Sequence, residues 1–204
     1  MRVILSRKGF DSGSGGCPSP LVSGEPLSLP IPSDHETPTT YGMLPRQMGA
    51  LVESLTRGRR HHYTQKHWCH LDPDLDPLAR PRRPGWRAGL GQVRAAQGHL
   101  HKQGVSPDDL FLFWGLFQPV EPSAGDSAWR YCGVREHRVF GWLQIGEVLP
   151  VGNQPQRWLQ HYPWLDGHPH LHGDEWHPSN TVYIARKRLR LAACRTDVFL
   201  PERL

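Results

Sequence analysis

The chain has 204 residues, which is enough for one domain with a substantial core and barely enough for two small ones. Its 8 Trp, 6 Phe and 5 Tyr argue against a disordered chain, and its 21 Gly and 20 Pro favour short strands and turns over long helices. The net charge of +5 permits an anionic partner but does not require one.

Histidine, cysteine and the N-terminus narrow the class of protein further. The 13 His are an excess that points to metal ligands or proton carriers. The four cysteines form no CxxC pair, which argues against a zinc knuckle and a dense disulfide framework. Residues 1–9 hold only three consecutive apolar residues, and no apolar run is as long as a membrane span. We therefore expect a cytoplasmic protein with no membrane partner.

The first half of the chain predicts short elements separated by turns. A buried strand is expected at 2–6, and a second strand at 27–31 is confined to a sheet edge by Pro30. A Gly/Ser-rich loop over 7–20 lies between them, and a short helix is expected over 47–55. The segment 57–84 is rich in Pro, Arg, His and Asp, and we interpret it as an ordered functional loop or a mobile insertion.

The second half carries the stronger patterns. Val93, Ala96 and Leu100 share one stripe of a predicted helix over 92–103, which Gly104 ends. Strands are expected at 110–114 and 138–149 around a polar loop over 118–130, then a short helix or turn over 158–166. Further strands are expected at 180–185 and near 189–193. The absence of repeats and linkers indicates one β-rich α+β domain over 1–204, with short flanking helices.

Two resemblances add to this reading. The helix and the two aromatic strands in 92–149 are similar in shape to PUA-like barrels of the EVE and ASCH kind, which bind modified bases; this implies a partly open barrel. A second resemblance rests on six blocks in a fixed order: 1–20, 28–32, 70–75, 95–100, the aromatic strands with 168–170, and 180–185. In these blocks the chain resembles the nucleotide modification associated domain 3 family. The family's name implies an association with nucleotide or DNA-base modification, a nucleotide or nucleic-acid partner, and other proteins of such a system.

Histidines and an aspartate form the candidate metal site. These residues are His70, Asp72, His99, His168 and His170. In extended chain, side chains two residues apart project to the same side, and Pro169 restricts the residue before it to extended conformations. A set of imidazoles with one carboxylate suits iron, manganese or zinc. The alternatives are a solvated Asx-Pro turn around Asp72 and a polar loop around His170.

The loop after the first strand is a candidate anion or substrate site. Its candidate residues are Arg7, Lys8, Gly9, Asp11, Ser12, Gly15 and Gly16. Glycines let backbone N–H groups turn inward, and two cations add positive charge. The loop is not a P-loop, because the GxxxxGK[ST] pattern is absent. The alternative is an ordinary surface loop.

Trp114 and Trp142 are candidates for stacking on a base, although aromatic residues in strands more often belong to the core. Three functions remain open from the sequence. The first is a metal-dependent enzyme acting on a nucleotide, nucleic acid or related substrate. The second is a non-catalytic PUA-like module that binds modified bases, and the third is an interaction subunit of a modification system. The first two hypotheses predict different metal contents, and the enzyme hypothesis predicts that the loop and the His/Asp clusters meet in space.

Overall fold

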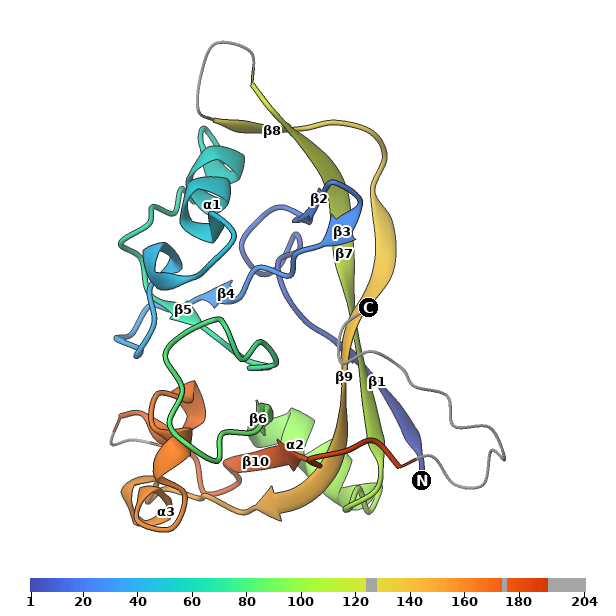
Figure 1. Cartoon of the computed structure of the whole chain (residues 1–204), viewed down its shortest axis with the longest axis vertical. Helices are drawn as coiled ribbons and strands as arrows, with labels where there is room; N and C mark the ends of the chain where they lie inside the picture. The colour runs from blue at the N-terminus through green and yellow to red at the C-terminus, as the bar shows by residue number, and fades with distance from the viewer. Residues whose placement is uncertain (124–127, 174–175, 191–204) are drawn as a thin grey trace.

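Two long antiparallel strands form the spine of the structure, a computed structural model that describes residues 1–123, 128–173 and 176–190 (Figure 1). They are β7 (Leu110–Pro122) and β9 (Glu136–Leu149). Their pairing runs from Leu110↔Gln144 to Phe117↔Glu136, with a register shift between Phe113 and Trp114. β7 is longer than its apolar run predicts. The expected polar loop over 118–130 is therefore wrong at its start, and residues 124–127 lie outside the described part of the chain.

The remaining strands extend this spine into an open mixed sheet. Its path is β3-β2-β7-β9-β10-β6, and β1 and β8 also pair with β7. The bounds are β1 (Val3–Arg7), β2 (Ser19–Val22), β3 (Glu25–Pro26), β6 (Gly89–Gln92), β8 (Trp129–Tyr131) and β10 (Thr181–Ala185). A separate pair joins β4 (Ile31–Pro32) to β5 (Cys69–His70). The described strands do not close on themselves, so the β-rich α+β class is confirmed and the PUA-like barrel is not.

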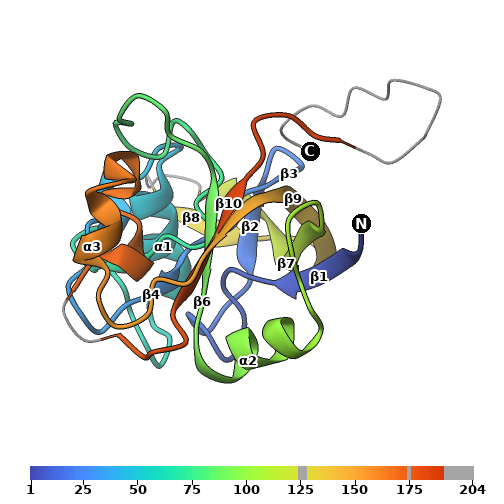
Figure 2. The same cartoon turned by 90° about the horizontal axis from the view of Figure 1, so that it is seen from below.

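The helices are short. They are α1 (Met48–Thr56), α2 (Arg94–Lys102) and α3 (Gln156–Leu159), with 3-10 turns η1 (Tyr41–Met43), η2 (Pro163–Leu165) and η3 (Pro169–Leu171). The helices expected near 47–55 and 92–103, and the short helix or turn over 158–166, are confirmed. Figures 1 and 2 show α1 and α3 on the same side of the β7–β9 spine.

Three expected strands differ from the structure. The strand expected at 2–6 forms as β1 but is not buried, since Val3 and Leu5 are 54% and 69% exposed. The alternation over 27–31 does mark buried side chains, since Leu27 and Leu29 are buried. Their backbone N–H groups bond to the Pro20 carbonyl and the Ser19 hydroxyl instead of a strand partner, so most of this segment is not a strand. Leu189 and the residue after it are not in a strand, and the rest of the strand expected near 189–193 lies outside the described residues.

The aromatic strands supply the core, as the sequence predicts. Phe111, Phe113 and Ile145 are at most 1% exposed and pack with Leu143 and Tyr183. A second cluster around α1 and a third around β10 fill the two ends of the spine. Within the described residues, no helix is long and apolar enough to cross a membrane.

Candidate metal centre

The free edge of β6 holds the segment that carries Asp72. Asp74 exchanges two backbone hydrogen bonds with Gly89, at 2.9 and 3.1 Å. Two residues along the strand, the Gly91 N–H donates to the Asp72 carboxylate at 2.6 Å, on its Oδ1 atom. Pairing along a strand edge therefore fixes the position of a carboxylate whose side chain is 2% exposed.

His170 is held by a side chain from the start of β10. Its Nδ1 atom lies 2.7 Å from the Asn180 side-chain oxygen, and the Asn180 amide donates to the His170 carbonyl at 2.9 Å. Because a carboxamide oxygen is an acceptor, the imidazole proton lies on Nδ1 and the lone pair lies on Nε2. Both residues are buried, so this ring is fixed in orientation with one nitrogen ready to bind a metal.

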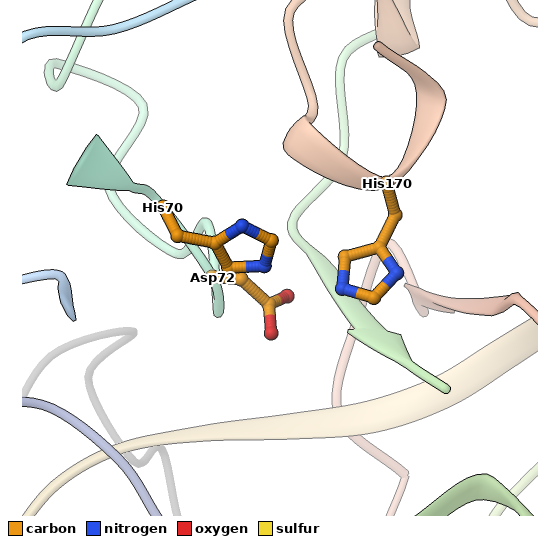
Figure 3. A group of neighbouring side chains, drawn as sticks. All are labelled: His70, Asp72 and His170. Atoms are coloured by element: carbon orange, nitrogen blue, oxygen red, sulfur yellow. The ribbon is translucent and has the colours of Figure 1, made fainter. Parts of the chain in front are cut away.

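His70, Asp72 and His170 converge, although 100 positions of the chain separate the first from the last. One ligand atom from each lies within 4.8 Å of the other two, and Figure 3 shows both imidazoles flanking the carboxylate. The centroids of the two rings are 5.1 Å apart. The ring of His70 offers one of its nitrogens to this group. This is a set of two imidazoles and one carboxylate.

His168 lies beside this group in a different role. Its Nδ1 atom accepts a hydrogen bond from the His170 N–H at 3.2 Å, so in the neutral ring the proton is on Nε2. That Nε2 atom is buried without a hydrogen-bond partner and lies 3.7 Å from Asp72 Oδ1. The ring therefore presents an N–H, and not a lone pair, to the carboxylate.

Glycines of β6 make room for these two rings. Gly89 and Gly91 face the same side of the strand, two residues apart. A Cβ atom at position 91 would overlap the His170 ring, and one at position 89 would lie 3.1 Å from His168 Nε2. Close approach of backbone and ring thus requires the absence of a side chain at position 91.

Lys8, at the end of β1, balances the charge of the site. Its Nζ atom donates to Asp72 Oδ2 at 3.0 Å, and its side chain is 18% exposed. Burial alone would raise the pKa of Asp72, but the positive charge of Lys8 and the neighbouring imidazoles hold that pKa below its usual value. Asp72 is therefore ionised at neutral pH.

The imidazoles are neutral at the same pH. Burial lowers the pKa of His70 to about 4 and that of His168 to about 3, although the Asp72 charge acts in the opposite direction. Burial also lowers the pKa of His170. An ionised carboxylate with neutral imidazoles has the protonation states that a metal requires of its ligands.

The family model described as nucleotide modification associated domain 3 matches residues 2–203. The chain belongs to this family. Searches of curated proteins and of solved structures found no match.

In this nucleotide modification associated domain, four of the five predicted metal-site residues lie together: His70, Asp72, His168 and His170. His99 does not join them. It lies exposed in the last turn of α2 and is not part of the convergent group. The helical stripe of α2 buries Gln97 and Leu100 instead, which turns position 99 toward solvent.

The Gly-rich loop contacts the His/Asp group through one of its two cations, Lys8. The other cation, Arg7, has different partners. Arg7 pairs with Asp11 at 3.0 Å and lies over the Trp114 ring. Asp11 also accepts the Gly13 and Ser14 N–H groups, and its carbonyl accepts from Gly16. These backbone N–H groups of the loop are therefore bonded to the loop's own aspartate. Gly9 and Gly15 have positive φ, and Ser12 is exposed.

The two candidates for stacking on a base, Trp114 and Trp142, lie in different parts of the structure. Trp142 lies on the wall of the large cavity described below. Trp114 lies outside that cavity, where its ring contacts Arg7 and the edge of His137.

Sequence reasoning missed four residues of the site: Asn180, Trp176, Gly89 and Gly91. Asn180 was expected only as the first residue of a strand, yet it holds His170. Trp176 stacks on His170 with ring centroids 4.7 Å apart. The Gly89-Leu90-Gly91 pattern did carry a usable signal, because glycines two apart in a strand indicate that another group approaches that face.

Proposed function

We propose that this protein is a divalent-metal-dependent enzyme acting on a nucleotide or nucleic acid, with His70, Asp72 and His170 as the metal ligands. The observation that carries the proposal is the convergence of two imidazoles and one carboxylate within 4.8 Å. This donor set suits iron, manganese or zinc and leaves coordination positions open for substrate. A bound ion would supply Lewis-acid or redox chemistry there. The nucleotide part rests on family membership.

The surroundings of the three ligands support a metal over a buried ion pair. Asn180 orients the His170 ring, and the Gly91 N–H orients the Asp72 carboxylate, as partners of metal ligands commonly do. His168 adds a third contact to the carboxylate, where it positions Asp72. A structural ion pair between Lys8 and Asp72 would need neither the His70 ring nor the buried His170 ring.

Metal content tests the proposal directly. Protein made without a His tag and dialysed against iron, manganese or zinc should hold stoichiometric metal by elemental analysis. His170→Ala should lose most of it, because the variant removes one of the three ligands; thermal unfolding checks that the variant is folded. His99→Ala is the matched control, since it removes an exposed imidazole away from the group.

The contrary outcomes are distinct. A parent protein that binds none of the three metals would remove the enzyme proposal. Metal-free protein that binds oligonucleotides containing modified bases would instead support the non-catalytic module. Equal metal loss in His170→Ala and His99→Ala would contradict the ligand assignment.

A further inference from the structure

A cavity of about 780 Å³ lies next to the Lys8–Asp72 pair. Asp72 is on its wall, as is Gly9, which directly follows Lys8 in the chain. The other walls come from residues of the segments 25–30, 44–48, 71–79 and 85–88, from β9, and from the end of β10 with the two residues after it. Ligand sites in proteins commonly have volumes of roughly 300–1,000 Å³. This cavity therefore has room for a ligand beside Asp72, the one member of the His/Asp group on its wall.

Several aromatic residues line the cavity. Trp86, Phe140 and Trp142 line it, together with leucines of the 25–30 and 71–79 segments. Arg82 lies over the Trp86 ring, 4.3 Å from its centroid. The Trp142 ring has no aromatic or cationic partner among the described residues. Flat aromatic groups gain stacking energy on such side chains.

Cationic side chains also line the cavity. Some of them are held in ion pairs and others are not. Arg87 is bound to Glu147 and Arg186 to Asp108, each at 2.6 Å. Arg46 lies 3.9 Å from the exposed Glu25. Lys187 is exposed and forms no ion pair with any described residue. An anionic group entering the cavity would therefore find Lys187 available, with Arg46 only loosely held.

We propose that this cavity binds one nucleotide unit, with the base against the aromatic residues that line it and the phosphate toward Lys187. A nucleotide combines a flat ring system with an anion, and the cavity offers partners for both. That the cavity is a substrate site rests on the proposed function. Binding of a nucleotide in the cavity does not itself need the metal. The unit is either a free mononucleotide or one residue of a nucleic-acid strand.

Calorimetric titration of the metal-free full chain at low salt tests this inference. The probes are deoxynucleoside 5′-monophosphates, the matching nucleosides, a single-stranded oligonucleotide and its duplex. Mononucleotides should bind better than nucleosides if a free unit is recognised; binding of the single strand alone would assign the unit to nucleic acid. Both results support the cavity, provided that the variants below behave as expected.

Two variants connect the binding to the cavity. Lys187→Ala should weaken phosphate-bearing probes roughly two- to fivefold, as expected for an exposed ion pair, and should leave nucleosides unchanged. Trp86→Leu should weaken every base-bearing probe roughly tenfold, as expected for the loss of a stacking partner. Lys66→Ala, which removes an exposed lysine outside the cavity, is the control. Thermal unfolding followed by circular dichroism checks that each variant is folded.

Absence of binding by every probe would overturn the inference, as would a folded Lys187→Ala and a folded Trp86→Leu that both bind like the parent. His170→Ala separates the two proposals, because it should lose metal and keep nucleotide binding. If the parent binds no metal but binds nucleotides through Trp86 and Lys187, the cavity stands and the enzyme proposal fails.

Discussion

Lys8 Nζ lies 3.0 Å from Asp72 Oδ2, so the end of the first strand supplies the counterion of a carboxylate 64 residues away. The ammonium group and a divalent metal would compete for the same negative charge. Lys8 therefore stabilises the metal-free site and opposes metal binding at the same time.

Replacing Lys8 by Met should separate these two effects. Without metal, Asp72 would keep the Gly91 N–H but lose its charged partner, and removing one partner of a buried pair typically costs about 3–5 kcal/mol of unfolding free energy. We expect a value near the lower end, because the Lys8 side chain keeps some exposure. Added zinc or manganese should restore more stability to this variant than to the parent, as measured by urea unfolding with and without metal.

Lys66→Met is the control for Lys8→Met, because it removes an equal charge from an exposed position. It should change neither the unfolding free energy nor the metal response. A Lys8→Met variant that is as stable as the parent and gains no more from metal would show that the ammonium group is not the counterion of Asp72.

Gly91→Ala should damage the site through sterics. The new Cβ would overlap the His170 ring, so either the ring or the strand must move. Movement of the strand would also lengthen the hydrogen bond from the residue 91 N–H to Asp72. We expect loss of most bound metal and a fall in stability of about 1–3 kcal/mol, as is usual for overpacking, measured by elemental analysis and urea unfolding.

The helix α2 offers a matched substitution. At Gly98, a Cβ atom would meet nothing within 4 Å, and the residue lies inside a helix. Gly98→Ala should therefore keep the metal and raise the unfolding free energy by about 0.5–1 kcal/mol. Similar metal contents in Gly91→Ala and Gly98→Ala would contradict the role of Gly91 as space for the ring.

Periodicity predicted the spine and the helices well, because apolar alternation reports directly which side chains are buried. It failed at 27–31, where the leucines are buried but the backbone bonds to Ser19 and the preceding strand. Alternation records the direction of side chains and not the partner of the backbone. It could not reveal that β7 continues to Pro122, since polar residues replace the apolar run there.

The sequence indicated which residue types form the site. It did not indicate how they come together in the fold. His70, Asp72 and His170 were identified because their side chains offer metal-ligand atoms at a spacing of two. His99 was included because it lies on the predicted helix that precedes the first aromatic strand, but the helix turns it to solvent. Asn180 was missed because a long-range hydrogen bond to a histidine leaves no local pattern.

Phe113→Ala tests the core that positions the site. Phe113 lies on β7 opposite Gly141 of β9, is fully buried, and stacks beside Phe111. Truncation should lower the unfolding free energy by roughly 3–5 kcal/mol. Leu5→Ala in the neighbouring strand is the control, because Leu5 is 69% exposed and should contribute little. An unchanged melting temperature in Phe113→Ala would place this strand at the periphery.

The histidines of the site should make the metal-free protein sensitive to mild acid. In the unfolded chain, His70 and His168 take up protons near pH 6.5, whereas burial holds their folded pKa values at about 4 and about 3. The unfolded state therefore binds more protons between pH 6.5 and 4, and stability falls as the pH is lowered through this window. Each such histidine contributes a slope of roughly 1.4 kcal/mol per pH unit. Urea unfolding in the presence of a chelator, at several pH values from 7.5 to 4.5, measures it.

His70→Gln should lower the slope of unfolding free energy against pH by the contribution of one histidine, because glutamine does not titrate. His61→Gln should leave the slope unchanged, since His61 is exposed. The two buried aspartates, Asp72 and Asp74, do not add to the loss of stability between pH 6.5 and 4. The lowered pKa of Asp72 gives stability that is lost only below its ordinary pKa, while burial raises the pKa of Asp74 despite its bond to Arg82 and so works in the opposite direction. If the His70→Gln slope equals that of the parent, the buried imidazoles are not the source of acid sensitivity, and the neutral ligand set proposed for the metal would lose its support.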